Sequence, residues 1–311
     1  MDEKNNKQLN GILILNKPKG PSSNLCVEKI KKRFKQKKVG HAGTLDPIAS
    51  GILIILLGQG TKLAPYLMEG YKVYRGIIQL GLETDTYDIT GNIVSKASEI
   101  DLREEDIIQG IETWKGLIEQ EVPPYSAAKH KGKPFYLLAR RGENPPLKTK
   151  KIYIDHLEVL DINLPFVEFR VRCSKGTYIR SLAHSLGKRL KVGGVLKDLL
   201  REEVYPYALE DAVTLNELLD HPEMFSKVVV PISESLPHWP KVIVDGAVAH
   251  RVKNGNPIKT GEITRIFPGK PGERCFFLDP LSRPLALMET CLRDGELYWR
   301  ILRGLWNRGF K

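Results

Sequence analysis

Apolar residues recur along this chain with the periods of strands and helices. The clearest strand lies at 167–173, where Val167, Phe169 and Val171 alternate with charged residues, a pattern that predicts a strand with one buried face. Further apolar stretches predict strands at 12–15, 52–57 and 71–80. Helices are predicted at about 22–34, 61–68, 107–114 and 179–190.

The pattern of the sequence changes at about residue 238. Short apolar stretches are split there by Gly and Pro, which predicts a small β-rich domain. At 311 residues and 41% hydrophobic content the chain can form more than one domain. We therefore expect a first domain over 1–236 and a second over 237–311, joined by a linker at about 231–240.

The chain carries an excess of positive charge. It has 48 Lys and Arg against 37 Asp and Glu, a net charge of +11, which favours a polyanionic partner such as nucleic acid. Part of the excess is concentrated within ten residues: Lys29, Lys31, Lys32, Arg33, Lys35, Lys37 and Lys38. A solvated helix face is the commoner origin of such a run, but its place directly before a glycine-rich segment favours phosphate contact.

A second basic segment interrupts the pattern at about 122–150. It contains five Lys and Arg residues between Lys129 and Arg141, together with the aromatics Tyr125, Phe135 and Tyr136. Basic residues interleaved with aromatic ones suit a loop that lies along RNA. The composition alone is equally compatible with an exposed surface insertion.

The glycine-rich segment at 40–51 contains a single carboxylate, Asp46. Three glycines and Pro47 surround it, although one Gly or one Asp-Pro step is enough to reverse a chain. From this segment alone, an ordinary turn and a catalytic loop are equally acceptable. Arg180 adds a second clue, because a cation in the first turn of a helix gains nothing from the helix dipole, so we expect a carboxylate partner for it.

Other features argue against several classes of protein. The four cysteines are widely spaced and form no C-x-x-C pair or Cys/His cluster, so neither a zinc site nor a disulfide framework is expected. The first ten residues lack the apolar core of a signal peptide, and no stretch approaches a membrane span. We expect a cytoplasmic protein with no metal and no membrane association.

Six motifs in order closely resemble the TruB family of tRNA pseudouridine synthases over residues 11–215. They are NKPKGPSS at 16–23, GHAGTLDPIASG at 40–51, KVY at 72–74, GLETDTYDITG at 81–91, PPYSA at 123–127 and SKGTYIR at 174–180. The C-terminus has a looser likeness to a PUA-type RNA-binding domain. The resemblance implies an α/β (α+β) fold: a mixed, largely antiparallel sheet with a thumb-like insertion at about 122–150, followed by a PUA-like domain.

The resemblance also implies roles for individual residues. Asp46 matches the catalytic nucleophile, Tyr74 the tyrosine that stacks on the target uracil, and Arg180 the residue that pairs with the aspartate. In that pair, Arg180 would keep Asp46 ionised and oriented. Tyr178 and Leu199 match residues that contact the target base.

Further matches concern the surroundings of the site. His41 matches a histidine beside the flipped nucleotide, and Asp88 an acidic position close to the RNA. Lys17 and Pro18 match a pair that supports the active-site loops. Lys129, in the basic insertion, is expected to contact phosphate.

The implied reaction converts the uridine at position 55 in the TΨC loop of tRNA to pseudouridine, with no cofactor and no obligate protein partner, in a monomer. Two alternatives are an RNA-folding protein with a secondary isomerase site and a guide-RNA-dependent relative from an H/ACA-type particle; the segment 129–141 argues against the second. One departure from the family pattern is Tyr205, which stands where Gly is common. We therefore expect the local turn to differ there.

Overall fold

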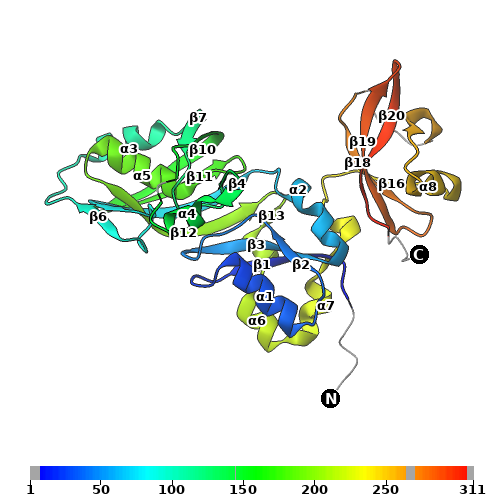
Figure 1. Cartoon of the computed structure of the whole chain (residues 1–311), viewed down its shortest axis with the longest axis horizontal. Helices are drawn as coiled ribbons and strands as arrows, with labels where there is room; N and C mark the ends of the chain where they lie inside the picture. The colour runs from blue at the N-terminus through cyan, green and yellow to red at the C-terminus, as the bar shows by residue number, and fades with distance from the viewer. Residues whose placement is uncertain (1–7, 144, 264–269, 307–311) are drawn as a thin grey trace.

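The computed structural model describes residues 8–143, 145–263 and 270–306. Most of the first ten residues, in which no signal peptide was expected, therefore lie outside the described residues. An eleven-stranded sheet and a five-stranded sheet lie along the long axis of the molecule (Figure 1). The strands are β1 (Gly11–Lys17), β2 (Val39–Ala42), β3 (Ala49–Leu57), β4 (Lys72–Leu80), β5 (Leu82–Thr84), β6 (Ile93–Lys96), β7 (Gly116–Glu121), β8 (Lys129–His130), β9 (Lys133–Pro134), β10 (Thr149–Asn163), β11 (Phe166–Cys173), β12 (Gly194–Val204), β13 (Tyr207–Ala208), β14 (Val213–Thr214), β15 (Val230–Pro231), β16 (Lys241–Ile243), β17 (Ile258–Lys259), β18 (Arg274–Leu278), β19 (Pro284–Arg293) and β20 (Glu296–Gly304). The α-helices are α1 (Ser23–Arg33), α2 (Ala64–Leu67), α3 (Glu104–Glu112), α4 (Phe135–Ala139), α5 (Ile179–Leu190), α6 (Leu215–Asp220), α7 (Phe225–Val228) and α8 (Gly246–Lys253), with 3-10 turns at Gly58–Leu63, Leu209–Asp211, Pro222–Met224, Ile232–Glu234 and Thr260–Glu262.

The large sheet is mixed and largely antiparallel, as predicted. Its main strand order is β14-β1-β3-β12-β4-β11-β10-β7, and three short strands pair outside this path. Only the β1–β14 and β3–β12 pairs are parallel among the described pairs of this sheet. The central strands therefore come from distant parts of the sequence, which places the ends of the β2–β3 loop, β4 and β12 next to one another.

The two central strands β1 and β3 are buried on both faces. Leu53 and Ile55 of β3 belong to the core beneath α1, α3, α5 and α6, whereas Ile52 and Ile54 belong to a second core on the opposite face. Burial on both faces explains why these strands are continuously apolar instead of alternating. In contrast, the predicted alternation of β11 is confirmed, because Val167, Phe169, Val171 and Cys173 are buried and the residues between them are only half-buried.

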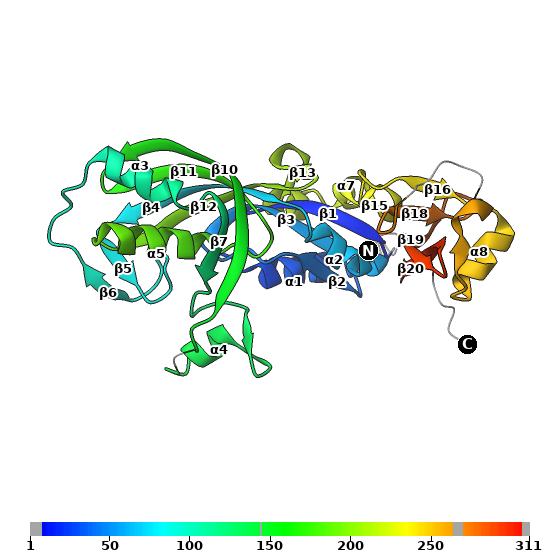
Figure 2. The ribbon, with the colours of Figure 1, turned by 90° about the horizontal axis from the view of Figure 1, so that it is seen from above.

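The basic insertion forms a small projection joined to the large sheet by β7 and β10. It contains β8, β9 and α4, and Figure 2 shows it extending away from the sheet. Phe135 and Leu138 are buried, so the projection has a small apolar core. The predicted thumb-like insertion is confirmed as a folded element.

The C-terminal residues form the predicted β-rich unit. Its sheet has the order β16-β18-β19-β20-β17 and packs against α8. The preceding segment at 231–240, expected as a linker, contributes side chains to a core: Leu236 and Trp239 are buried in the second core, together with Phe276 and Leu287 of the C-terminal sheet. The two sheets therefore share one apolar core.

Tyr205 follows the last residue of β12 and begins the turn into β13. Its ring lies beside those of Tyr71 and His238, with centroids 5.1 Å apart in each pair, and its amide donates to the Tyr71 carbonyl at 3.1 Å. No helix within the described residues is long and apolar enough to cross a membrane.

Candidate active site

The loop that carries Asp46 is fixed by hydrogen bonds from two other segments. The Ser23 hydroxyl, at the start of α1, donates to the Leu45 carbonyl at 2.9 Å and accepts from the Leu45 amide at 2.8 Å. The Gly20 amide donates to the Pro47 carbonyl at 2.8 Å. Because the residues on both sides of Asp46 are held in this way, the backbone presents its carboxylate in one orientation.

The glycines of this loop have separate structural purposes. Gly43 has a φ of +93°, in the region that L side chains rarely adopt. Gly51 has a φ of +99°, and a Cβ there would lie 2.3 Å from the carbonyl oxygen of Arg201. Gly51 therefore lets β3 and β12 approach closely, which brings the end of the Asp46 loop against β12.

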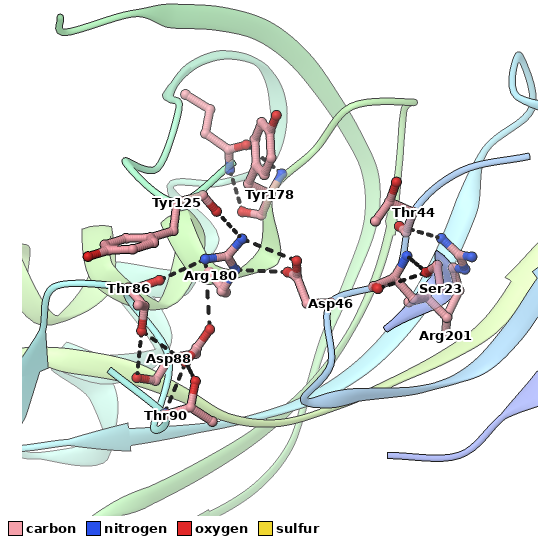
Figure 3. A network of polar contacts seen from close by, with 12 residues as sticks. Ser23, Thr44, Asp46, Thr86, Asp88, Thr90, Tyr125, Tyr178, Arg180 and Arg201 are labelled. Atoms are coloured by element: carbon pink, nitrogen blue, oxygen red, sulfur yellow. Dashed lines mark hydrogen bonds and ion pairs between the residues drawn. The ribbon is translucent and has the colours of Figure 1, made fainter. Parts of the chain in front are cut away.

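Asp46 and Arg180 form a two-point ion pair. The Nε of Arg180 lies 2.8 Å from Oδ2 of Asp46, and its Nη2 lies 3.3 Å from Oδ1. The Arg180 side chain is 5% exposed, whereas that of Asp46 is 36% exposed. The arginine is thus a buried support, and the carboxylate is the partner that a ligand can reach (Figure 3).

The rest of the Arg180 guanidinium is held from the opposite side. Its Nη1 donates to the Thr86 carbonyl and its Nη2 to the Tyr125 carbonyl, each at 2.9 Å. The buried carboxylate of Asp88 lies 3.7 Å from Nη1. Asp88 in turn accepts from the Thr86 hydroxyl at 2.9 Å and from the Thr90 amide at 3.0 Å.

This arrangement joins four segments around one side chain: the Asp46 loop, the 81–91 motif, the base of the insertion and α5. The sequence indicated Asp46, Asp88 and Arg180 but not the carbonyls of Thr86 and Tyr125. Every residue has a backbone carbonyl, so the residue type does not show which carbonyls accept a hydrogen bond from a distant side chain. The sequence did contain one signal for Asp88: Thr86 and Thr90 lie two positions away on either side, where their hydroxyl or amide groups can bond its carboxylate.

Tyr178 is held at the N-terminus of α5. Its amide donates to Oε1 of Gln120 at 2.7 Å, and its carbonyl accepts from Nε2 of the same residue at 3.0 Å. Burial raises the pKa of the Tyr178 hydroxyl, which keeps it protonated at neutral pH. Gln120 on β7 thus fixes the turn that leads to Arg180 and could not be recognised from its sequence context.

Tyr74 and Leu199 lie on neighbouring strands of the large sheet. Tyr74 on β4 is 7% exposed and Leu199 on β12 is 5% exposed, and both belong to the main core. Burial raises the pKa of the Tyr74 hydroxyl, while the positive charge of Arg201 opposes the rise. The charge of Asp46 also acts on this pKa, which places Tyr74 within electrostatic reach of the carboxylate.

His41 lies on β2, just before the Asp46 loop. Burial lowers the pKa of its imidazole, and the positive charge of Arg201 lowers it further, so the ring is neutral at neutral pH. The Nδ1 atom is buried and has no hydrogen-bond partner within the described residues. A neutral ring suits a side chain that packs against a base.

Lys17 holds the turn beside this loop. Its buried ammonium donates to the carbonyl oxygens of Pro18 and Pro21 at 2.8 and 2.9 Å, while Pro18 itself is exposed. Burial lowers the pKa of Lys17. Lys129 is exposed on β8 of the insertion and takes no part in the network around Asp46.

Comparison with known proteins supports the resemblance. A family model described as TruB family pseudouridylate synthase (N terminal domain) matches residues 31–179. A protein of Oleidesulfovibrio alaskensis named tRNA pseudouridine synthase B is 50% identical over 303 residues, covering 96% of this chain and 97% of that protein. The chain belongs to the TruB family. The enzyme of the same name from Thermotoga maritima is 38% identical and covers 94% and 96% of the two chains.

Two solved structures resemble most of this fold. A Cbf5-Nop10-Gar1 complex contains a chain that is 26% identical, with a TM-score of 0.73 over 96% of this chain and 85% of that one. An H/ACA RNP bound to a substrate RNA containing 2'-deoxyuridine gives 25% identity and a TM-score of 0.72, covering 96% and 86%. The likeness to these two complexes therefore covers almost the whole of this chain.

Proposed function

We propose that this TruB-family protein converts uridine to pseudouridine in tRNA, at position 55 in the TΨC loop. The observation that carries the proposal is the half-exposed Asp46 carboxylate on a fixed loop, held at two points by the buried Arg180. Two contacts to one guanidinium fix the orientation of the carboxylate. They also leave one edge of the carboxylate available to a sugar or a base.

The reaction balances without a cofactor. The bond between C1′ of the ribose and N1 of uracil breaks, the base rotates, and a bond forms between C1′ and C5. The proton on C5 is lost and N1 gains a proton, so no net oxidation occurs. We propose Asp46 as the nucleophile that assists cleavage and Arg180 as the group that orients it.

The remaining site residues would hold the base during its rotation. Tyr74 would stack on the uracil, and Tyr178 and Leu199 would bound the pocket. His41, kept neutral by burial, would lie beside the flipped nucleotide without repelling or attracting the phosphates. We further propose that Lys17 and Pro18 support the loops and that Asp88 fixes Arg180 near the RNA.

Extrusion of the base from the RNA stack costs a few kcal/mol. Phosphate contacts from the basic run at 29–38 and from Lys129 in the insertion would offset this cost. We propose residues 1–236 as the catalytic domain and 237–311 as a PUA-like RNA-binding domain. The chain would act in the cytoplasm as a monomer, without a partner protein.

The test is pseudouridine mapping on unmodified tRNA incubated with the purified chain alone. We expect modification at position 55 by the wild-type protein and none by Asp46→Asn, with unchanged tRNA binding. A matched control is Asp85→Asn, since the Asp85 carboxylate accepts its hydrogen bonds from Asn92 in the described structure. Wild-type turnover by Asp46→Asn would exclude this residue as the nucleophile, and modification at another uridine would exclude the proposed site.

A separate RNA-folding role can be tested with the same variant. Asp46→Asn leaves the basic surfaces intact, so a folding activity that is independent of isomerisation would survive in it. Equal loss of tRNA refolding and isomerisation would exclude the separate role. A requirement for added guide RNA or protein would instead favour a mode of action like that of the H/ACA particles.

A further inference from the structure

Arg201 is a buried arginine whose position the reaction scheme does not use. It is 1% exposed on β12, paired across the sheet with Tyr74 of β4 and with Gly51 of β3. One neighbouring strand therefore carries the proposed stacking residue, and the other begins at the end of the Asp46 loop. No other described residue is paired with both Tyr74 and this loop.

The guanidinium of Arg201 is satisfied mainly by carbonyl oxygens. Its Nε donates to the Ile52 carbonyl at 2.7 Å, its Nη2 to the Gly43 carbonyl at 3.2 Å and its Nη1 to the Thr44 carbonyl at 3.4 Å. Gly43 and Thr44 directly precede the Leu45–Asp46 step, and Ile52 follows the loop. One planar group therefore spans both ends of the loop that carries the proposed nucleophile; Figure 3 shows its contact with Thr44.

No carboxylate forms an ion pair with Arg201 within the described part of the chain. Its buried charge instead depends on the carbonyl dipoles, because an uncompensated buried charge is strongly unfavourable. The dependence is mutual, since these carbonyls would lose their donor if the guanidinium moved. The conformation of the loop and the position of Arg201 are thus linked.

Arg201 also acts on Tyr74. The two residues are paired between β12 and β4, and the positive charge of Arg201 opposes the rise in the pKa of the Tyr74 hydroxyl, so the ring that would stack on the uracil and the loop that would attack the ribose share one neighbour. We infer that Arg201 is a positioning residue that fixes the distance between the Asp46 carboxylate and the Tyr74 ring. This inference rests on the proposed function, but its structural part can be measured without any reaction.

The first experiment compares Arg201→Lys with wild type in single-turnover isomerisation and in tRNA binding. Lysine keeps a charge but cannot direct donors to three separate carbonyls. We expect the rate to fall roughly 10²-fold, as for a small misplacement of reacting groups, with the Kd for tRNA changed less than threefold. Arg170→Lys is the control, because Arg170 on β11 pairs with Glu202 away from the loop.

A double-variant cycle tests the link to Tyr74. If Arg201 acts partly through the hydroxyl, Arg201→Lys combined with Tyr74→Phe will lose less activity than the product of the two separate losses. Independent, multiplicative losses would overturn the coupling. A rate within twofold of wild type for Arg201→Lys would overturn the whole inference, as would a loss of activity explained entirely by the unfolded fraction.

Amide hydrogen exchange supplies the measurement that needs no activity. In Arg201→Lys the amides of Leu45 and Ala49 should exchange at least tenfold faster, while those in the middle of β1 keep their protection. Unchanged exchange at both loop amides would overturn the inference. If wild type forms no pseudouridine but the exchange result holds, the proposed function fails and the positioning role stands.

Should Arg201→Lys not fold, Gly43→Ala replaces it. A Cβ at Gly43 would lie 3.8 Å from Nη1 of Arg201, so there is space, but the φ of +93° is strained for alanine. The variant keeps Arg201 but is expected to reorient the Gly43 carbonyl, which accepts from its Nη2. A reduced rate with unchanged tRNA binding supports the inference, and a wild-type rate overturns it.

Discussion

Arg180 and Arg201 are both buried beside the same loop, but different groups stabilise their charges. Arg180 contacts the carboxylates of Asp46 and Asp88, whereas the main partners of Arg201 are the backbone carbonyls of Gly43, Thr44 and Ile52. A carboxylate partner brings an ionisable group to the site. Carbonyl partners fix only the path of the backbone. The comparison separates the part of the site that does chemistry from the part that holds its shape.

The largest effect is expected from Arg180→Met, which removes the arginine whose charge the carboxylates stabilise. It leaves Asp46 and the buried Asp88 without their cation, so we expect the single-turnover rate to fall by about 10²–10³-fold. Stability should fall by roughly 3–5 kcal/mol, since one member of a buried pair is lost. Urea unfolding and the isomerisation assay measure the two effects.

The matched control for Arg180→Met is Arg189→Met, because Arg189 is an exposed residue of the same helix. It should change neither activity nor stability by much. An Arg180→Met protein that retains more than a tenth of the wild-type rate would remove Arg180 from the proposed chemistry.

Asp88→Asn should have an intermediate effect. It removes the more distant charge, at 3.7 Å, but keeps an oxygen that can accept from Thr86 and Thr90. We expect a loss of activity of about tenfold, corresponding to roughly 1.4 kcal/mol in the barrier. A loss of activity equal to that of Arg180→Met would show that Asp46 and Asp88 act as one unit.

Replacement of Lys129, Lys131 and Lys133 by alanine should affect binding and leave the chemistry intact. These side chains are exposed on the projecting insertion, outside both arginine networks. We expect the KM for tRNA to rise several-fold and its salt dependence to weaken, with kcat unchanged. Titration at several salt concentrations measures this, with the exposed Lys227→Ala of α7 as control; a fall in kcat would place the insertion closer to the reaction.

The smallest effect concerns a third cation near this site. Burial, assisted by the charge of Arg201, lowers the pKa of Lys72 to about 8. Between that value and the ordinary one of 10.5 the unfolded chain binds more protons than the folded one, so stability rises with pH. Relative to Lys72→Met, wild type should gain roughly 2–3 kcal/mol in unfolding free energy as the pH rises from about 8 to 10.5.

Denaturant unfolding at several pH values measures this gain, and the exposed Lys96→Met serves as control. The tyrosines whose pKa burial raises act in the opposite direction above pH 10, but they are common to both proteins and cancel in the comparison. A difference that stays constant with pH would mean that Lys72 titrates normally.

Much of this fold could be predicted from periodicity alone. Helix α1 was expected at 22–34 and lies at Ser23–Arg33, with the Ser22 side chain accepting from the Leu25 amide. The strands β1, β3, β4 and β11 were also expected near their observed places. These elements were predictable because local pattern and tertiary burial agree in them.

What could not be predicted depends on contacts between distant segments. The dipole argument indicated that Arg180 needs a carboxylate, but the residue that supplies it lies 134 positions away. Arg201 shares the buried face of β12 with Leu199, so an arginine two positions from a core leucine was a signal that we did not use. Backbone carbonyls accept the three hydrogen bonds of Arg201 and two of those of Arg180, and every residue has a carbonyl, so no residue type reveals them.

The core shared by the two sheets limits how this chain can be divided. Ile12, Ile14 and Ile52 lie on the face that Trp239 and Phe276 help to cover. A polypeptide cut after residue 236 would leave that face open to water, and exposed apolar strands associate with one another. We expect such a fragment to be less soluble than the full chain even though it contains Asp46, Arg180 and Arg201, which centrifugation of the two proteins after expression would measure.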